Sequence, residues 1–226
     1  MSFFTAFGRR PGKKARQQYS QLFNYKDGQF QNPVPTPALA EGQSMPKILW
    51  EFFKKHPETS PDKPLPSVQT DLKRLHPLEN VLVWFGHSSY FIQLDGKRFL
   101  VDPVFSGNAS PIPGSLKSFP GTNDYQAEDM PPIDYLVITH DHWDHLDYPT
   151  VMGLKNKIGK IITPLGVGSY FQQWGFAKNM IHEGDWNEVV NEEQLQIHIL
   201  PARHFSGRLL TRNKTLWGSF ALITPN

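Results

Sequence analysis

The chain of 226 residues contains no cysteine. This absence excludes disulfide bonds, thiolate nucleophiles and thiolate metal ligands together, so any transition-metal site must be built from imidazole and carboxylate groups. It also agrees with a cytoplasmic protein, where thiols rather than disulfides are the rule. The histidines therefore deserve the closest reading, and the chain has only nine of them.

The sequence also lacks a long hydrophobic run. No apolar segment approaches the roughly 18 residues that a membrane-spanning helix needs. The N-terminal segment MSFFTAFGRRPGKKARQQ has its apolar residues before its charges, which is the reverse of a secretory signal peptide. We therefore expect a cytoplasmic protein, with peripheral contact at a membrane surface as the remaining form of membrane association.

The formal net charge is only +2, but basic residues are concentrated near the N-terminus. Residues 9–16 include five Arg or Lys and no acidic residue. We expect a solvated, flexible tail here, and contact with anionic lipid or another acidic surface is the alternative. Because no further basic stripe with interleaved aromatic residues follows, a nucleic-acid partner is not expected.

Proline divides the chain into two parts. Residues 31–80 contain nine of the twenty prolines and one short helical candidate, MPKILWEFFKKH. This composition predicts an extended arm over residues 1–79 and a domain over residues 80–226. The domain begins with three predicted strands, NVLVWFG, SYFIQLDG and KRFLVDP, and Asp95-Gly96 is a typical hairpin turn between the last two.

Strands and helices alternate after this β-rich start. IDYLVITH predicts a strand buried on both faces, followed by a helix that Asp147 caps, that has Pro149 in its first turn and that extends to about Lys155. The next predicted elements are the strand GKIITP, the helix GVGSYFQQWGF ended by Gly175, and the strands KNMIHEG, EEQLQIHILPARHF and TLWGSFALITP. Their order predicts a mixed α/β sandwich with helices outside the sheets.

Three of the nine histidines lie within six residues, directly after the strand IDYLVITH. His140, His142, Asp144 and His145 form the pattern His-x-His-x-Asp-His. In an extended segment, residues i and i+2 point the same way, so His140 and His142 can converge on one cation. Asp144 and His145 follow where the chain turns toward the helix, and they can reach a second cation. Imidazole and carboxylate ligands favour Zn²⁺, with Mn²⁺ and Fe²⁺ as alternatives.

At these residues the sequence resembles the metallo-β-lactamase superfamily of hydrolases. The segments WFGHSSYFIQLDGKRFLVDPVFS, YLVITHDHWDHLD, ITPLGVGSYFQQWGF, LPARHF and LWGSFALI resemble the branch that includes N-acyl phosphatidylethanolamine-hydrolysing phospholipase D. The resemblance implies an αβ/βα sandwich with two metals at the strand ends and a water between them. It also implies that His204 completes the first metal site with His140 and His142, and that Asp144 and His145 bind the second metal.

Further residues are candidates around these ligands. The resemblance implies that His87 orients substrate or a ligand, and Asp144 is expected to orient the attacking hydroxide as well as to bind metal. Asp102 ends a strand, where its carboxylate can accept the second N–H of a ligand histidine. Asp185 and Trp186 resemble a loop lining the relatives' site, where an indole would pack against substrate. A structural role is the alternative for His87, Asp185 and Trp186. No role is predicted for four histidines: His56, His76, His182 and His198.

The predicted reaction is hydrolysis by a metal-bound hydroxide, because a metal lowers the pKa of water from about 15.7 toward 7. Phospholipase D-like hydrolysis of a phosphodiester, in a lipid or a small molecule, is the favoured reaction. A lactone, amide or small-ester hydrolase of the same superfamily is the first alternative, because one fold supports many substrates. A non-catalytic fragment, or one half of an assembly with an incomplete metal site, is the second.

The family pattern is incomplete after His204. The resemblance implies a bridging aspartate and a last histidine there, whereas the segment FSGRLLTRNKTLWGSFALITPN has no Asp, Glu or His. We therefore expect the sequence to correspond to the N-terminal portion of the superfamily domain, with a weakly held second metal. A sheet edge and an apolar face left uncovered would favour self-association or a partner chain.

Overall fold

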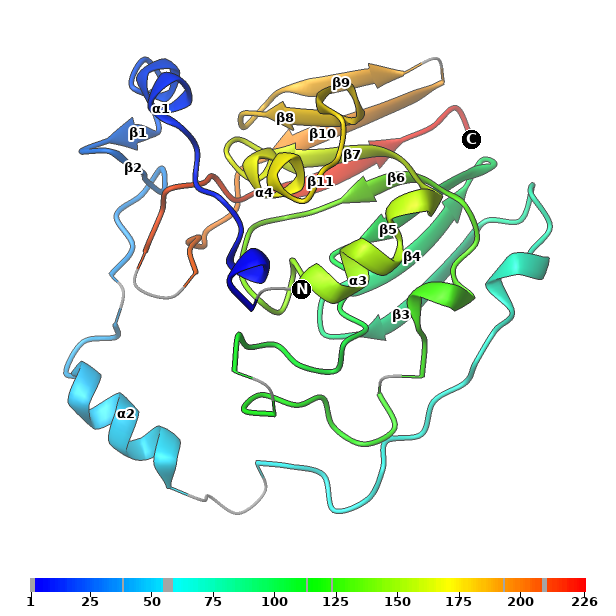
Figure 1. Ribbon diagram of the computed structural model, residues 1–226, viewed down its shortest axis with the longest axis horizontal. Helices are drawn as coiled ribbons and strands as arrows, with labels where there is room; N and C mark the ends of the chain where they lie inside the picture. Colours follow the sequence, from blue (N-terminus) through cyan, green and yellow to red (C-terminus); the bar gives the residue numbers. More distant parts are fainter. Residues whose placement is uncertain are drawn as a thin grey trace.

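Two packed β-sheets form the centre of the protein (Figure 1). The computed structural model describes residues 3–37, 39–54, 59–112, 114–122, 124–192, 194–208 and 211–226. The larger sheet has the strand order β3-β4-β5-β6-β7-β8, and the smaller one has the order β11-β10-β9. Helices cover the outer face of the larger sheet, so the predicted mixed α/β sandwich is confirmed.

The first three strands of the domain are those that the sequence predicts. They are β3 (Val81–Gly86), β4 (Ser89–Leu94) and β5 (Lys97–Val101), and each is antiparallel to the next. Asp95 and Gly96 both have positive φ, 47° and 75°, as the favoured two-residue hairpin turn requires. This hairpin carries His87 and Asp102 at its strand ends.

The parallel part of the sheet follows through crossover helices. Strands β6 (Ile133–Val137), β7 (Ile158–Pro164) and β8 (Ile181–Gly184) run parallel to β5. Helices α3 (Tyr148–Gly153) and α4 (Gly168–Gln173) pack against one face through a buried apolar cluster. Asp147 is the N-cap residue of α3 as predicted, although the helix ends at Gly153 and short 3-10 turns continue the chain. The 3-10 turns around these elements are Ala127–Asp129, Lys155–Lys157 and Lys178–Met180.

The smaller sheet contains β9 (Val189–Glu192), β10 (Leu195–Leu200) and β11 (Ser219–Ile223). Strand β9, which pairs with β10 as a hairpin, is not among the strands predicted from the sequence. In β10 the buried residues alternate with more exposed ones, so Ile197 and Ile199 face Val137 and Ile162 of the larger sheet while His198 faces outward. The two sheets thus enclose a second apolar core.

The N-terminal arm is more ordered than the sequence suggests. It contains the 3-10 turns Phe3–Phe7 and Leu72–Arg74, helices α1 (Lys13–Tyr19) and α2 (Met45–Phe53), and the short strands β1 (Tyr25–Lys26) and β2 (Gln29–Phe30). Helix α2 is the predicted one. The expectation of a flexible basic tail is wrong for residues 13–16, because they form α1 and Tyr19 at its end packs against Tyr25 and Phe30.

Helix α2 stands apart from the sheets at one side of the molecule (Figure 1). None of the helices in the described part of the chain is long and apolar enough to cross a bilayer. The boundary between an arm over residues 1–79 and a domain over residues 80–226 stays a prediction.

Candidate metal centre

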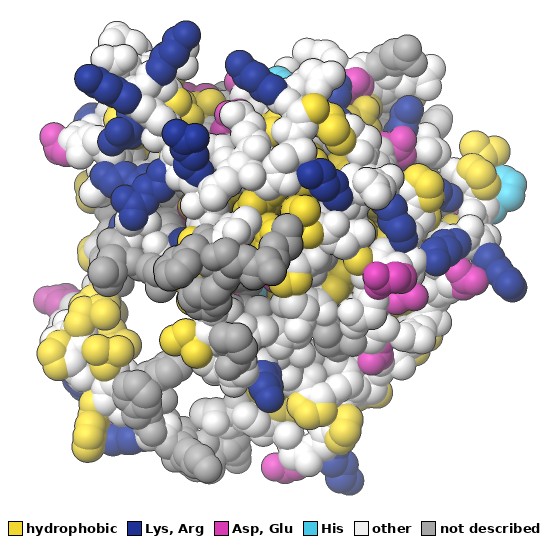
Figure 2. All heavy atoms as spheres, viewed as in Figure 1, with side chains coloured by type: hydrophobic (Ala, Val, Ile, Leu, Met, Phe, Trp, Pro, Cys, Tyr) yellow, Lys and Arg dark blue, Asp and Glu magenta, His cyan; other side chains and the backbone are white. Residues whose placement is uncertain are grey.

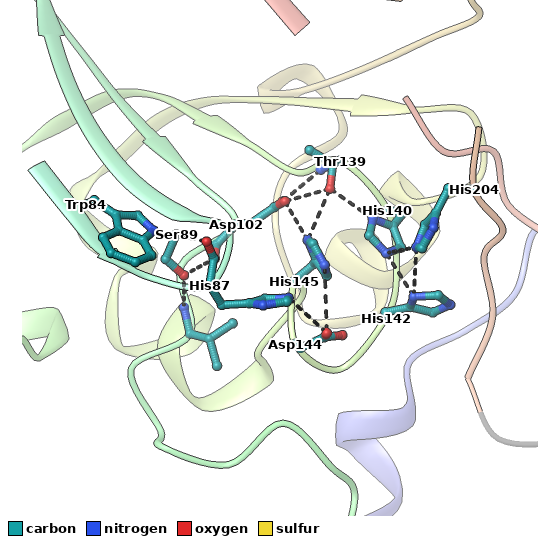
Figure 3. A network of polar contacts seen from close by, with 11 residues as sticks. Trp84, His87, Ser89, Asp102, Thr139, His140, His142, Asp144, His145 and His204 are labelled. Carbon is teal, nitrogen blue, oxygen red and sulfur yellow. Dashed lines mark hydrogen bonds and ion pairs between the residues drawn. The ribbon is translucent and has the colours of Figure 1, made fainter. Parts of the chain in front are cut away.

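The candidate residues gather at one edge of the sandwich (Figure 3). The loop that carries the His-x-His-x-Asp-His pattern leaves the carboxyl end of β6, and Asp102 follows the neighbouring strand β5. His87 follows β3, which points the same way as β5, and His204 lies in the loop after β10. Because strand ends of the same sense meet at one edge, residues far apart in sequence become neighbours.

Three histidine nitrogens point at one another. His140 Nε2 lies 2.9 Å from His142 Nδ1 and 3.1 Å from His204 Nε2, and the last two are 3.3 Å apart. A neutral imidazole has one N–H, so three such nitrogens cannot all be satisfied by hydrogen bonds within the triangle. Tetrahedral Zn²⁺ with Zn–N distances of about 2.0–2.1 Å would hold its nitrogens about 3.3 Å apart. This donor set therefore fits a cation that takes imidazole ligands.

Burial keeps this cluster uncharged. Desolvation and the neighbouring histidines lower the pKa of His140 far below its usual range, and burial lowers the pKa of His142 to about 4. Burial also lowers the pKa of His204, with His145 acting in the same direction. All three rings are thus neutral at pH 7, and protons do not compete with a cation for their nitrogens.

A second cluster lies beside the first. Asp144 Oδ2 is 3.0 Å from His87 Nε2 and 3.9 Å from His145 Nε2, and these three atoms could also bind one cation. The two clusters adjoin, since the rings of His140 and His145 have centroids only 4.0 Å apart. His87 is predicted from the sequence to orient substrate or a ligand, and in the structure its Nε2 atom belongs to the second cluster.

Asp102 connects the two clusters from behind. Its carboxylate is fully buried, and Oδ2 accepts hydrogen bonds from His145 Nδ1 at 2.7 Å and from Thr139 Oγ1 at 2.6 Å. Oδ1 accepts the Thr139 N–H at 2.8 Å, and Thr139 Oγ1 lies 2.9 Å from His140 Nδ1. The predicted contact between Asp102 and a candidate ligand histidine is present. Sequence reasoning missed Thr139, whose only signal was its position directly before His140.

This network fixes which nitrogen of each ring faces the cluster. Since Asp102 accepts the proton on Nδ1 of His145, Nε2 of that ring stays free to bind a cation. The Thr139 hydroxyl donates its proton to Asp102, so its oxygen accepts the N–H of His140 Nδ1. Nε2 of His140 is therefore also free to bind a cation. Although burial opposes it, the hydrogen bond and charge of Asp102 raise the pKa of His145.

Two of the residues at the site have a strained backbone. His87 has φ 45° and Asp102 has φ 41°, in the left-handed region that residues other than glycine rarely adopt. Such conformations cost about 1–3 kcal/mol each and persist only where the surrounding structure enforces them. Their location at the two clusters supports a functional reading of this edge.

Comparison with known families agrees with the sequence resemblance. The β-lactamase superfamily domain matches residues 97–226, which include three strands of the larger sheet after β5 and the whole smaller sheet. The chain belongs to the β-lactamase superfamily.

The chain is similar to several known proteins. An uncharacterized protein of Mycobacterium tuberculosis is 38% identical over 207 residues, which cover 90% of this chain and 55% of the relative. The N-acyl-phosphatidylethanolamine-hydrolyzing phospholipase D 1 of Caenorhabditis elegans is 34% identical over 158 residues, covering 63% of this chain and 43% of the relative. The crystal structure of CmlA, a diiron β-hydroxylase of Streptomyces venezuelae, matches 66% of this chain and 28% of its own with 27% identity and a TM-score of 0.48. The chain spans about half the length of the two sequence relatives.

A cavity of about 690 Å³ opens onto the candidate metal centre between the two sheets. Its wall includes His140, His145 and His204, and apolar side chains such as Ile92 and Leu222 line its far part. A second cavity of about 470 Å³ is lined by His87 and Asp144 together with the aromatic side chains of Trp84 and Phe119. Apolar substrate groups thus have space next to both clusters.

Asp185 and Trp186 lie outside the residues that line these cavities. Trp186 is 4% exposed and donates its indole N–H to the Trp217 carbonyl, while Asp185 accepts a hydrogen bond from the Asn24 side chain. The Trp186 ring also packs against Phe23, so both residues connect the domain to the N-terminal arm, and their contact with substrate stays a prediction. Of the remaining histidines, His182 pairs with Glu188, and His56 lies outside the described residues.

Proposed function

We propose that the protein is a metal-dependent hydrolase that cleaves a phosphodiester in a phospholipase D-like reaction. The observation that carries the proposal is the convergence of three neutral imidazole nitrogens beside a second cluster of two histidines and a carboxylate. Membership of the β-lactamase superfamily supports the same reaction class. The phosphodiester is favoured because the relative from Caenorhabditis elegans is a phospholipase D that hydrolyses an N-acylated phospholipid.

In this proposal His140, His142 and His204 hold one metal ion, and Asp144 and His145 contribute to a second one with His87 beside them. Zn²⁺ is favoured because nitrogen and oxygen donors without sulfur suit it, while Mn²⁺ and Fe²⁺ are the alternatives. A bound cation of this kind supplies Lewis acidity, which lowers the pKa of water and stabilises charge on the leaving oxygen.

The side chains of the chain itself have separate tasks in this reaction. Asp144 lies within reach of both candidate histidines of the second cluster, so its carboxylate can orient the attacking water and accept a proton. His87 is well exposed beside it and can donate a hydrogen bond to a substrate oxygen. Asp102 and Thr139 keep the ligand rings in the required tautomers.

The test is a set of hydrolysis assays on the 226-residue chain loaded in turn with Zn²⁺, Mn²⁺ and Fe²⁺. Its substrates are a chromogenic phosphodiester, an N-acylated phosphatidylethanolamine and a lactone. We expect phosphodiester turnover that His142→Ala abolishes and that His198→Ala, a substitution of an outward-facing histidine, leaves intact. Turnover of the lactone alone would favour the alternative hydrolase. A chain that binds no metal at all would favour a non-catalytic fragment.

We further propose that the N-terminal arm contacts an anionic membrane surface. On α2, Met45, Leu49 and Trp50 are 55%, 51% and 67% exposed. Figure 2 shows apolar side chains over α2 and Lys and Arg side chains over α1 on the same face of the molecule. The strength of peripheral membrane binding depends on buried apolar area together with electrostatic attraction to anionic lipids, and this face offers both.

Sedimentation with vesicles tests this contact. We expect binding to phosphatidylcholine vesicles that contain phosphatidylglycerol, weakened by salt and by Trp50→Ser. Trp84→Ser, which changes an equally exposed indole on β3, is the matched control. Equal binding to vesicles with and without phosphatidylglycerol, or equal binding of both variants, would refute the proposal.

A further inference from the structure

Asp141 is the residue between the two histidines that begin the His-x-His-x-Asp-His pattern, and it is 2% exposed. Its carboxylate accepts three hydrogen bonds from distant parts of the chain. Oδ1 accepts the Gly207 N–H at 2.6 Å, while Oδ2 accepts the Tyr170 hydroxyl at 2.7 Å and the Thr215 hydroxyl at 3.0 Å. Asp141 therefore joins the loop of His140 and His142 to the loop of His204, since Gly207 lies three residues after His204.

Arg208 makes the same connection from the opposite direction. Its side chain is buried and donates Nε–H to the Asp141 carbonyl at 2.7 Å, while Nη2 donates to the Leu146 carbonyl. These two carbonyls lie near the beginning and the end of the loop that carries His140, His142, Asp144 and His145. Nη1 donates to the Ala6 carbonyl at 2.8 Å, and the guanidinium carbon lies over the Trp143 ring, 4.0 Å from its centroid.

We propose that Asp141 and Arg208 are positioning residues that lock the two ligand-bearing loops together and so bring His204 to His140 and His142. The proposal rests on the proposed function, because the locked geometry matters only if a cation binds there. The amide of an asparagine cannot fully replace the Asp141 carboxylate, and the amine of a lysine cannot fully replace the Arg208 guanidinium. The rigid fork of arginine reaches two carbonyls at once, and lysine, a single point of charge, cannot.

The geometry explains why such a lock is needed. A metal site requires its ligand atoms within about 0.2 Å of their ideal distances. His204 follows a strand of the smaller sheet, whereas His140 and His142 follow a strand of the larger one, and no strand pairing among the described residues connects the two loops. The hydrogen bonds that Asp141 accepts from Gly207 and from Arg208 join those two loops behind the three rings. Removal of groups that orient metal ligands typically weakens metal binding 10- to 100-fold.

The experiment measures the affinity of the 226-residue chain for Zn²⁺ by competition with a chromophoric chelator, and its visible absorption with Co²⁺. The variants are Asp141→Asn, Arg208→Lys and the milder Thr215→Val, which removes one donor to Asp141 and keeps the side-chain shape. Glu183→Gln is the matched control, because that half-buried carboxylate accepts the N–H groups of Gly166 and Gly168, and its hydrogen bonds in the described part of the chain reach neither ligand loop. Thermal unfolding in chelator measures the stability of each variant without metal.

We expect Zn²⁺ binding about 10- to 100-fold weaker in Asp141→Asn and Arg208→Lys, with a smaller loss in Thr215→Val. The Co²⁺ spectrum should change in the same order, while Glu183→Gln loses stability and keeps its affinity and spectrum. If the folded variants bind Zn²⁺ as the unsubstituted chain does, the positioning role is refuted. If the unsubstituted chain itself binds no metal, the proposed function fails instead. If affinity falls in proportion to stability in all variants, the control included, the two residues are only structural.

Discussion

Replacement of Asp102 by asparagine keeps the shape of the side chain but changes which hydrogen bonds it can accept, and so tests how the ligand rings are oriented. The Thr139 N–H donates to Oδ1 of Asp102, so the oxygen of an asparagine must take that position. Its amide N–H₂ then faces His145 Nδ1 and the Thr139 hydroxyl, where the carboxylate oxygen accepts two hydrogen bonds. His145 must become the acceptor at Nδ1 and move its proton to Nε2, the atom that faces the second cluster.

The same change reaches the first cluster through Thr139. When its hydroxyl accepts from the asparagine, it donates to His140 Nδ1, and the proton of His140 moves to Nε2. Both rings then present an N–H to the cation rather than a lone pair. Loss of such an orienting partner weakens metal binding about 10- to 100-fold, which corresponds to about 1.4–2.7 kcal/mol.

The assay is competitive Zn²⁺ titration, combined with ¹⁵N NMR of the imidazole nitrogens to read the tautomers. Asp147→Asn is the control, since this buried carboxylate bonds Ser106 and Thr150 and no histidine. We expect an affinity loss and a tautomer change only for Asp102→Asn. An Asp102→Asn chain that binds Zn²⁺ within about twofold of the unsubstituted affinity would refute the reasoning, because 10-fold is the smallest loss expected.

Three further predictions follow from other parts of the molecule. Burial lowers the pKa of His142 to about 4, so as the pH falls from about 6.5 to about 4 this histidine takes up a proton in the unfolded chain before it does so in the folded one. The free energy of unfolding of the metal-free chain should therefore fall over this pH range by up to about 1.4 kcal/mol per pH unit for this group. Urea unfolding at several pH values should show a weaker pH dependence for His142→Ala. Gly207→Ala should destabilise the fold and weaken Zn²⁺ binding, because its φ is 138° and a Cβ would lie 1.9 Å from the Thr211 carbonyl oxygen; an unchanged melting temperature would contradict this. Leu82 and Trp84 are each 63% exposed on the edge strand β3, so we propose self-association there, which light scattering should detect and Trp84→Lys should reduce.

The sequence predicted most of the domain because its strands have strong local signals. Alternating or continuous apolar runs and the Asp95-Gly96 turn identify β3 to β7 without any tertiary information. Strand β9 was not predicted, because it has only four residues and gains its stability from pairing with β10. Helix α1 was not predicted for a related reason. Its conformation depends on the packing of Tyr19 against other residues of the arm, and its basic composition does not indicate that packing.

Some of the candidate ligands likewise have a local sequence signal, whereas others are brought together only by the fold. His140, His142, Asp144 and His145 lie on one short loop, so their spacing alone suggests a metal site. The pairing of His87 with Asp144 spans 57 residues and depends on two strands ending at one edge. No local pattern could have indicated that Asp141 receives the N–H of Gly207, 66 residues away, or that a buried arginine bonds two carbonyls of the ligand loop.

The two clusters therefore depend on different supports. The strained residues His87 and Asp102 belong to the β3–β4–β5 hairpin, where the Trp84 indole donates to the His87 carbonyl at 3.0 Å and the Ser89 hydroxyl donates to the Asp102 carbonyl at 2.5 Å. These bonds hold the backbone conformation that aims both side chains at the second cluster. The first cluster depends in addition on the loop that contains His204 and on Arg208, which donates to the Asp141 carbonyl between His140 and His142. Asp102 also reaches His140 through Thr139, but His87 belongs to the hairpin and His204 does not. Damage to the hairpin should therefore weaken the second cluster first, whereas damage at Arg208 should weaken the three-histidine cluster first.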